Sequence, residues 1–195
     1  MLKRFYEVIE KLDHSRRFLQ TSPFGPRLSN SIEEYGKGVF WDTHGLWNFD
    51  GPVDGSWKEL WDKGDLRFYS ELGSPGASSA ELLRKYKGDL KVFPCSSYSP
   101  LWNRNPWWID WPKFIQKKGH APENLEEFVA WGQARQSAAP ALATRAALSR
   151  FPACGGFMVW MGRDAFPCSA NTDVIDFDGN LKSAAAALAK VYREA

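Results

Sequence analysis

The stretch Arg67-Phe68-Tyr69-Ser70-Glu71-Leu72-Gly73 leads an apolar, aromatic segment into a carboxylate and then into a glycine. Strand interiors disfavour Glu, and an ionised side chain at a buried strand end requires partners or a shifted pKa. The pattern therefore predicts a strand over 65–71 with Glu71 at its carboxyl end. Two interpretations of Glu71 are open: a catalytic carboxylate, or a Glu that pairs with Arg67 or caps a helix beginning near Pro75.

Strand-like and helix-like segments alternate along the whole chain. Strands are predicted over 17–22, 38–44, 65–71 and 155–161, and helices over 2–12, 56–63, 78–86, 123–149 and 181–192. Because the strands lack a strict apolar–polar alternation, they are typical of a parallel sheet covered by helices. The segment 88–121, rich in Pro and Trp, is predicted to be a long loop. The predicted fold class is α/β.

Groups that can bind or react stand at the end of each of these strands. They are Thr21 and Ser22, then Asp42 and His44, then Glu71, then Trp160 and Asp164. The active site of a (β/α) barrel is built from the carboxyl ends of its strands, so we expect Glu71, His44 and Trp160 to converge. Strict alternation would also place Glu71 on the same side of its strand as Tyr69. For Asp42, His44 and Asp164, a structural role as a strand-end cap or turn former is equally open.

Composition indicates a globular chain with an unusual aromatic content. The 195 residues are 44% hydrophobic and 25% charged, which suits one domain with a substantial core. The ten Trp residues concentrate at 41–61 and 102–111. Trp rings fill cores but also form platforms for sugar rings, and clusters in loop-like segments favour a binding surface.

Charge and cysteine usage exclude several classes of partner. The net charge is +2 with basic and acidic residues interleaved, so we expect neither a nucleic-acid nor a membrane-surface partner. No apolar run is long enough to span a bilayer, and the cellular compartment stays open. The three cysteines, Cys95, Cys154 and Cys168, lack zinc-ligand spacing and are predicted to be buried small hydrophobes. We expect no cofactor.

Four blocks carry a family resemblance. They are SRRFLQTSPFG at 15–25, VFWDTHGLW at 39–47, RFYSELGSPGASS at 67–79, and GGFMVWMGRDAFPCSANTDVIDFDGNLKSAAAALAKVY at 155–192. In this order they resemble strands five to eight of the catalytic TIM barrel of glycoside hydrolase family two, which includes β-galactosidases, β-glucuronidases and β-mannosidases. The first block departs from the family pattern in having Arg17 where Pro is frequent.

The resemblance implies a retaining glycoside hydrolase acting on terminal β-linked sugars, similar to a β-mannosidase or a β-galactosidase. Residues 1–195 would form the C-terminal half of its barrel domain, with Glu71 as the nucleophile. Trp160 would lie beneath the terminal sugar. The other residues implied in substrate binding are His44, Asp42, Asp164 and Trp47, whereas Asp176 and Lys182 belong to a terminal hairpin motif and are interpreted as structural.

The family's acid/base residue has no counterpart in this sequence. In the family it is the Glu of an Asn-Glu pair at the end of strand four, and the chain contains only the reverse order, Glu123-Asn124, before a helix. Retaining glycosidases need two carboxyl groups about 5–5.5 Å apart. We therefore expect a piece of a longer enzyme, completed by the missing N-terminal half of the parent chain or by self-association.

Two other classes of protein remain open as interpretations of the sequence. A non-catalytic carbohydrate-binding protein with a degenerate glycosidase site would account for the Trp clusters and the absent acid/base. A flavodoxin-like nucleotide-binding domain is disfavoured, because Gly73-Ser74-Pro75-Gly76 has a Pro where a phosphate loop needs a backbone N–H. Azide rescue of an activated glycoside separates an enzyme from a lectin.

Overall fold

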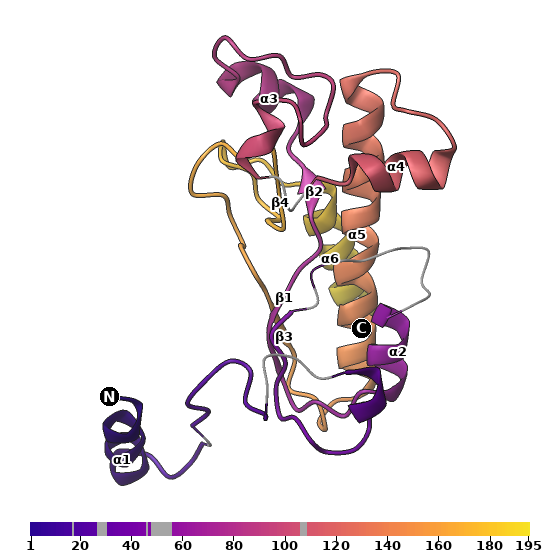
Figure 1. Cartoon of the computed structure of the whole chain (residues 1–195). Coiled ribbons are helices and arrows are strands. Elements are labelled where there is room, and N and C mark those ends of the chain that lie inside the picture. The colour runs from indigo at the N-terminus through magenta and orange to yellow at the C-terminus, as the bar shows by residue number, and fades with distance from the viewer. Residues whose placement is uncertain (17, 27–30, 46, 48–55, 106–108) are drawn as a thin grey trace.

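The computed structural model describes residues 1–16, 18–26, 31–45, 47, 56–105 and 109–195. Its α-helices are α1 (Leu2–Leu12), α2 (Ser56–Lys63), α3 (Ala80–Tyr86), α4 (Trp111–Lys118), α5 (Leu125–Ser149) and α6 (Ser183–Glu194). Two 3-10 helices are η1 (Ile32–Glu34) and η2 (Trp102–Arg104), and the strands are β1 (Tyr69–Leu72), β2 (Gly76–Ala77), β3 (Phe157–Val159) and β4 (Ala170–Asn171). The result is a mixed α/β fold with small sheets (Figure 1).

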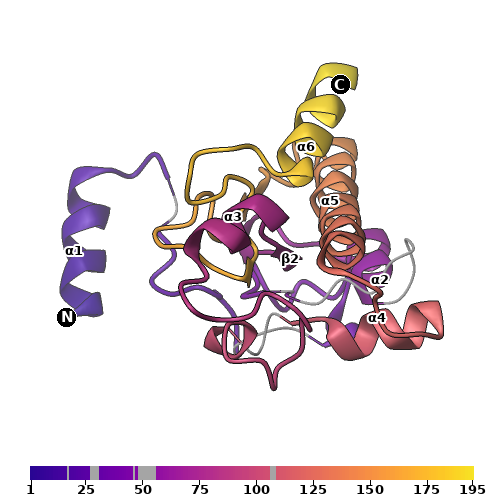
Figure 2. The same ribbon diagram turned by 90° about the horizontal axis from the view of Figure 1, so that it is seen from above.

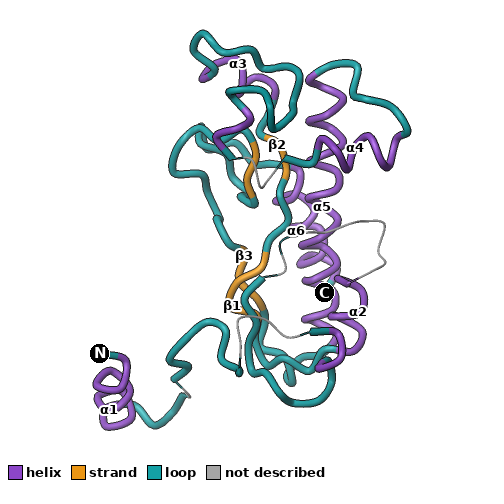
Figure 3. The backbone as a smooth tube through the Cα atoms, viewed as in Figure 1, coloured by secondary structure: helices purple, strands orange, loops and turns teal. Residues whose placement is uncertain are grey.

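The strands form two separate two-stranded sheets. β1 pairs in parallel with β3, and β2 pairs antiparallel with β4 (Figure 3). The segment before Gly45 follows the other edge of β1: the Arg67 N–H donates to the carbonyl of Trp41 at 3.1 Å, and the Gly45 N–H donates to the carbonyl of Glu71 at 2.9 Å. The Trp41 N–H in turn donates to the carbonyl of Phe24 at 3.1 Å. These four stretches of chain thus lie side by side in sequence order, and the described residues form no closed barrel.

The predicted strands are only partly correct. The described residues of 17–22 form no strand, and 38–44 contributes a single bridge, between His44 and Glu71. The prediction failed because a strand needs a continuous ladder of backbone hydrogen bonds, and these segments make isolated ones. The strands predicted over 65–71 and 155–161 exist but are shorter than expected.

The predicted helices are confirmed, and α5 organises the fold. Asn124 caps α5 by accepting from the Glu127 N–H at 2.9 Å, and the helix then extends for 25 residues beside α6 (Figures 1 and 2). Its N-terminal half belongs to an aromatic core with α3, α4 and η2, and its C-terminal half to a second core with α2 and β1. One long helix therefore joins the two sheets.

The prediction of a continuous loop over 88–121 was wrong. This segment contains η2 and the helix α4, which has Pro112 in its first turn, where a missing N–H costs nothing. Phe114 anchors α4 in the aromatic core, and Gly119 ends the helix with a φ of 78°. The prolines that indicated a loop therefore start a helix here.

The helix α1 lies apart from the rest of the molecule in both views (Figures 1 and 2). None of its residues is buried, and its apolar side chains Leu2, Phe5, Val8 and Leu12 are exposed. No helix among the described residues is long and apolar enough to cross a membrane. The three cysteines are buried and free, as predicted.

Candidate active site

An irregularity in β1 determines where Glu71 points. Tyr69 is matched to Phe157 and Leu72 to Val159, so three steps along β1 correspond to two along β3. Tyr69 and Leu72 are both buried, whereas Glu71 is partly exposed. Strict alternation, which would have placed Glu71 on the side of Tyr69, was therefore a wrong expectation. Bulges of this kind occur next to active sites, where they re-aim a side chain.

The structure brings four of the candidate residues together at the end of β1. His44 Nδ1 lies 3.2 Å from Glu71 Oε2, with the two side chains 30% and 21% exposed. The ring of His44 meets Trp47 edge-on at 5.6 Å between centroids, and Trp47 meets Trp160 at 5.1 Å. Trp160 is 37% exposed. A carboxylate, an imidazole and two indole rings thus form one partly exposed cluster.

Trp160 is held through its backbone at both ends. Its N–H donates to the carbonyl of Leu72 at 2.8 Å, and its carbonyl accepts from the hydroxyl of Thr172 at 2.8 Å. Thr172 is buried and also lies against Gly73, where an added Cβ would come within 2.8 Å of the Thr172 Cβ. Thr172 therefore supports Gly73, which follows β1, and it also supports the backbone of Trp160.

Asp42 contacts β1 at Ser70, the residue before Glu71. Its Oδ1 accepts from the backbone N–H of Ser70 at 2.7 Å, and its Oδ2 accepts from the Ser70 hydroxyl at 2.5 Å. The Ser70 hydroxyl also contacts that of Ser22. Because Asp42 is 1% exposed, these contacts fit the structural interpretation left open by the sequence. Asp42 fixes the residue that precedes Glu71.

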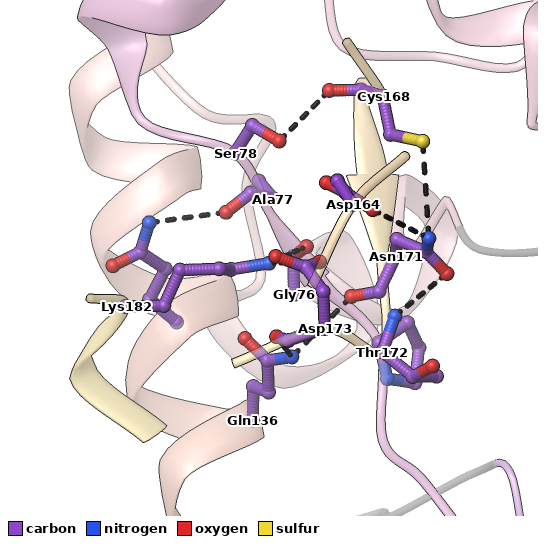
Figure 4. Close-up of polar contacts among 12 residues, drawn as sticks. Gly76, Ala77, Ser78, Gln136, Asp164, Cys168, Asn171, Thr172, Asp173 and Lys182 are labelled. Carbon is purple, nitrogen blue, oxygen red and sulfur yellow. Dashed lines mark hydrogen bonds and ion pairs between the residues drawn. The ribbon is translucent and has the colours of Figure 1, made fainter. Parts of the chain in front are cut away.

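Asp164 belongs to a different, buried polar network around β2 and β4 (Figure 4). Its Oδ1 accepts from Asn171 Nδ2 at 2.7 Å. Lys182 Nζ donates to Asp173 Oδ1 at 2.9 Å and to the carbonyl of Gly76 at 3.0 Å. Gln136 Nε2, from α5, donates to the carbonyl of Asp173 at 2.8 Å. The network ties the second sheet to α5 and the start of α6.

Burial sets the charge state of this network. It raises the pKa of Asp173 to about 6 and also raises the pKa of Asp164, although the ammonium of Lys182 acts in the opposite direction on both. Asp164 Oδ2 and Asp173 Oδ2 have no hydrogen-bond partner among the described residues. The ammonium of Lys182 contacts Asp173, and burial favours the protonated form of both carboxyl groups.

Sequence reasoning missed most of these supporting residues. Ser70, Asn171 and Thr172 stand beside residues that were singled out, but nothing in a single sequence shows which carbonyl a hydroxyl or amide will reach. The one supporting residue that was singled out was Lys182, through the terminal hairpin motif to which it belongs. Its interpretation as structural agrees with its contacts to Asp173 and Gly76.

Comparisons with known proteins bear on the fold. No family model matches the chain, and no curated protein matches it. Among solved structures, the chain is similar to the β-D-mannosidase from Dictyoglomus thermophilum, with a TM-score of 0.70 and 20% sequence identity. The match covers 96% of this chain and 22% of that chain, so this chain spans less than a quarter of its structural neighbour. The likeness shows a shared fold.

Proposed function

We propose that residues 1–195 form part of the catalytic barrel of a retaining glycoside hydrolase related to family two, acting on terminal β-linked sugars. The observation that carries the proposal is the cluster at the end of β1, where Glu71 lies 3.2 Å from His44 and Trp47 packs on Trp160. The fold likeness to a β-mannosidase supports it. Within this class of enzyme, we propose more specifically an activity similar to that of a β-mannosidase or a β-galactosidase.

In this proposal Glu71 is the nucleophile. A carboxylate oxygen of Glu71 attacks the anomeric carbon as the bond to the leaving oxygen breaks, and a carboxylic acid outside this chain protonates that oxygen. Deprotonated, the same acid then takes a proton from water, which attacks the anomeric carbon and releases Glu71. The two steps retain the anomeric configuration and need no cofactor.

The aromatic and imidazole groups take binding roles in this proposal. The exposed ring of Trp160 forms the platform beneath the terminal sugar, with Trp47 packed against its edge. His44 donates to a sugar hydroxyl or to Glu71. Asp42 acts through Ser70, and Asp164 through the buried network, so both are positioning residues rather than sugar ligands.

The open side of β3 is where we place the rest of the barrel. Among the described residues β3 has one neighbouring strand, β1, and beside it lies a hollow of about 220 Å³ lined partly by Phe68, Leu148 and Phe151. Phe151 is 74% exposed. An open strand edge beside exposed apolar side chains is a surface for pairing. The 195-residue chain alone is expected to self-associate, and a monomer by light scattering at micromolar concentration would contradict this placement.

The experiment for the activity is azide rescue in the whole protein that carries this chain. Glu71→Ala should lower hydrolysis of an aryl β-glycoside on the order of a thousandfold or more, and azide should restore turnover by forming a glycosyl azide of inverted configuration. The matched control is Glu81→Ala, an exposed Glu on α3. Near-normal activity of Glu71→Ala would refute the assignment.

A second function is favoured by two observations. The exposed indole of Trp160 and the lack of an Asn-Glu pair both fit a non-catalytic carbohydrate-binding protein with a degenerate glycosidase site. That protein would bind a β-glycoside, lose binding when Trp160 is changed to Ala, and show no turnover with or without azide. The rescue experiment therefore separates the two functions.

A further inference from the structure

Another hollow, of about 290 Å³, lies at the amino end of the parallel strands. Its lining comes from the segments 38–41, 64–67 and 150–153 and includes Asp65, Arg67 and Arg150. These segments precede His44, β1 and β3, which pair in parallel. The residues before parallel strands gather at one edge of the sheet, so this hollow lies at the opposite end of β1 from Glu71.

Hydrogen bonds hold the three segments of the lining side by side. The Arg67 N–H donates to the carbonyl of Trp41 at 3.1 Å, and the Arg67 carbonyl accepts from the N–H of Gly155 at 2.7 Å. Asp65 Oδ2 accepts from the N–H of Gly38 at 2.5 Å. The walls are thus fixed before a ligand arrives, which lowers the entropic cost of binding.

Two arginines line the hollow without a carboxylate partner. Arg67 Nη1 donates to the carbonyl of Ala153 at 3.5 Å. Arg150 donates from Nη1 to the hydroxyl of Tyr69 at 3.1 Å and from Nη2 to the carbonyl of Leu66 at 3.2 Å. Neither guanidinium forms an ion pair within the described part of the chain. Since a guanidinium carries five N–H donors, most donors of both groups are available to a ligand.

The charges around the hollow favour an oxyanion. Arg67 and Arg150 outweigh the single carboxylate of Asp65, and guanidinium forks match the oxygens of a phosphate. Asp65 Oδ1 accepts no hydrogen bond from the described residues, so it can accept from a hydroxyl of the ligand. The volume is close to the lower end of the range of about 300–1,000 Å³ for small-ligand clefts, which suits a small molecule.

We propose that this hollow binds a small phosphomonoester, with its phosphate on Arg67 and Arg150 and a hydroxyl group on Asp65. The sequence left Arg67 open as a partner of Glu71, but Glu71 lies against His44, and Arg67 lines the hollow instead. The site is separate from the Glu71 cluster and does not rest on the proposed function.

The test is calorimetric titration of the whole protein that carries this chain with inorganic phosphate, glycerol phosphate and glycerol. Glycerol phosphate should bind more tightly than inorganic phosphate, because only its hydroxyl groups reach Asp65, and glycerol should not bind. Added NaCl should weaken the binding of both anions, since salt screens exposed charges.

The decisive variant is Arg67→Gln, because Arg67 is exposed and its side chain makes one weak contact, whereas Arg150 also holds Tyr69 and Leu66. Losing a charge-assisted hydrogen bond should weaken the binding of both anions about tenfold or more. Arg67→Lys keeps the charge without the fork and should lose less. The matched control is Arg193→Gln, an exposed arginine on α6.

Four results would overturn the inference. If neither anion binds, another part of the protein covers the hollow. If Arg67→Gln and Arg193→Gln weaken binding equally, or if salt has no effect, the two arginines do not form a site. If glycerol phosphate binds no more tightly than inorganic phosphate, the ligand is not a phosphomonoester held by Asp65. Glu71→Ala should bind both anions as the wild type does, so failure of this site and failure of the proposed function are distinguishable.

Discussion

Replacing Lys182 by Met tests the buried network around β2 and β4. The Lys182 side chain is 2% exposed and that of Asp173 is 0% exposed, and their atoms Nζ and Oδ1 are 2.9 Å apart. Met is also unbranched and is one heavy atom shorter than Lys, and it removes the ammonium. Asp173 then has no cation in contact, and the carbonyl of Gly76 loses a donor.

The expected cost follows from that burial. Removing one partner of a buried ion pair lowers the free energy of unfolding by about 3–5 kcal/mol, because the remaining charge is uncompensated. For a domain of 150–250 residues that unfolds as one unit, 1 kcal/mol corresponds to a shift of about 2–4 °C in melting temperature. We therefore expect Lys182→Met to melt about 6–20 °C below the wild type.

The assay is thermal unfolding of the whole protein followed by tryptophan fluorescence. Adding Asp173→Asn to Lys182→Met should recover part of the loss, because the uncompensated charge is then absent. The control is Lys190→Met on α6, where the side chain is 69% exposed and its surface pair contributes little. A loss below about 1 kcal/mol for Lys182→Met, or no recovery in the double variant, would refute the reasoning about this network.

Two further predictions concern the same region. Burial raises the folded-state pKa of Asp173 to about 6, above its ordinary value of 3.8, so the folded protein binds a proton more tightly than the unfolded chain does. The wild type should therefore gain stability relative to Asp173→Asn as the pH falls from 7 toward 4, measured by urea unfolding across that range; a difference that is independent of pH would contradict it. Thr172→Val removes the hydroxyl that donates to the carbonyl of Trp160, and should cost about 1 kcal/mol of stability and raise the KM for an aryl β-glycoside with little change in kcat. An unchanged KM would show that Thr172 does not position Trp160.

The helices were accessible from the sequence because their signals are local. Apolar spacing and the Asn124 cap are contained within one helix, so α5 could be predicted almost to the residue. Strand predictions depended on partners that a sequence does not show. The sequence of 17–22 favours a strand, but its described residues form no ladder of backbone hydrogen bonds with a neighbouring strand. The strands β2 and β4 have two residues each, which is too short for an alternation of apolar and polar side chains to be recognised.

The candidate site was predictable in its residue types but not in its geometry. Glu71, His44 and Trp160 could be singled out because each lies at a predicted strand end. The bulge between Tyr69 and Leu72, which turns Glu71 away from the core, depends on register with β3 and so could not be predicted. Asp42 and Asp164 were equally plausible as ligands or as structural groups, and only their contacts with Ser70 and Asn171 distinguish these roles.

The central claim is that Glu71 is the residue that bonds to the sugar. The most direct measurement is mass spectrometry of peptides from the whole protein after reaction with a 2-deoxy-2-fluoro β-glycoside, whose fluorine slows breakdown of the covalent intermediate. We predict one added sugar on the peptide that contains Glu71, and none on that peptide in the Glu71→Gln variant. A label on Asp42 or Asp164, or no label in a protein that hydrolyses aryl β-glycosides with retention, would contradict the claim.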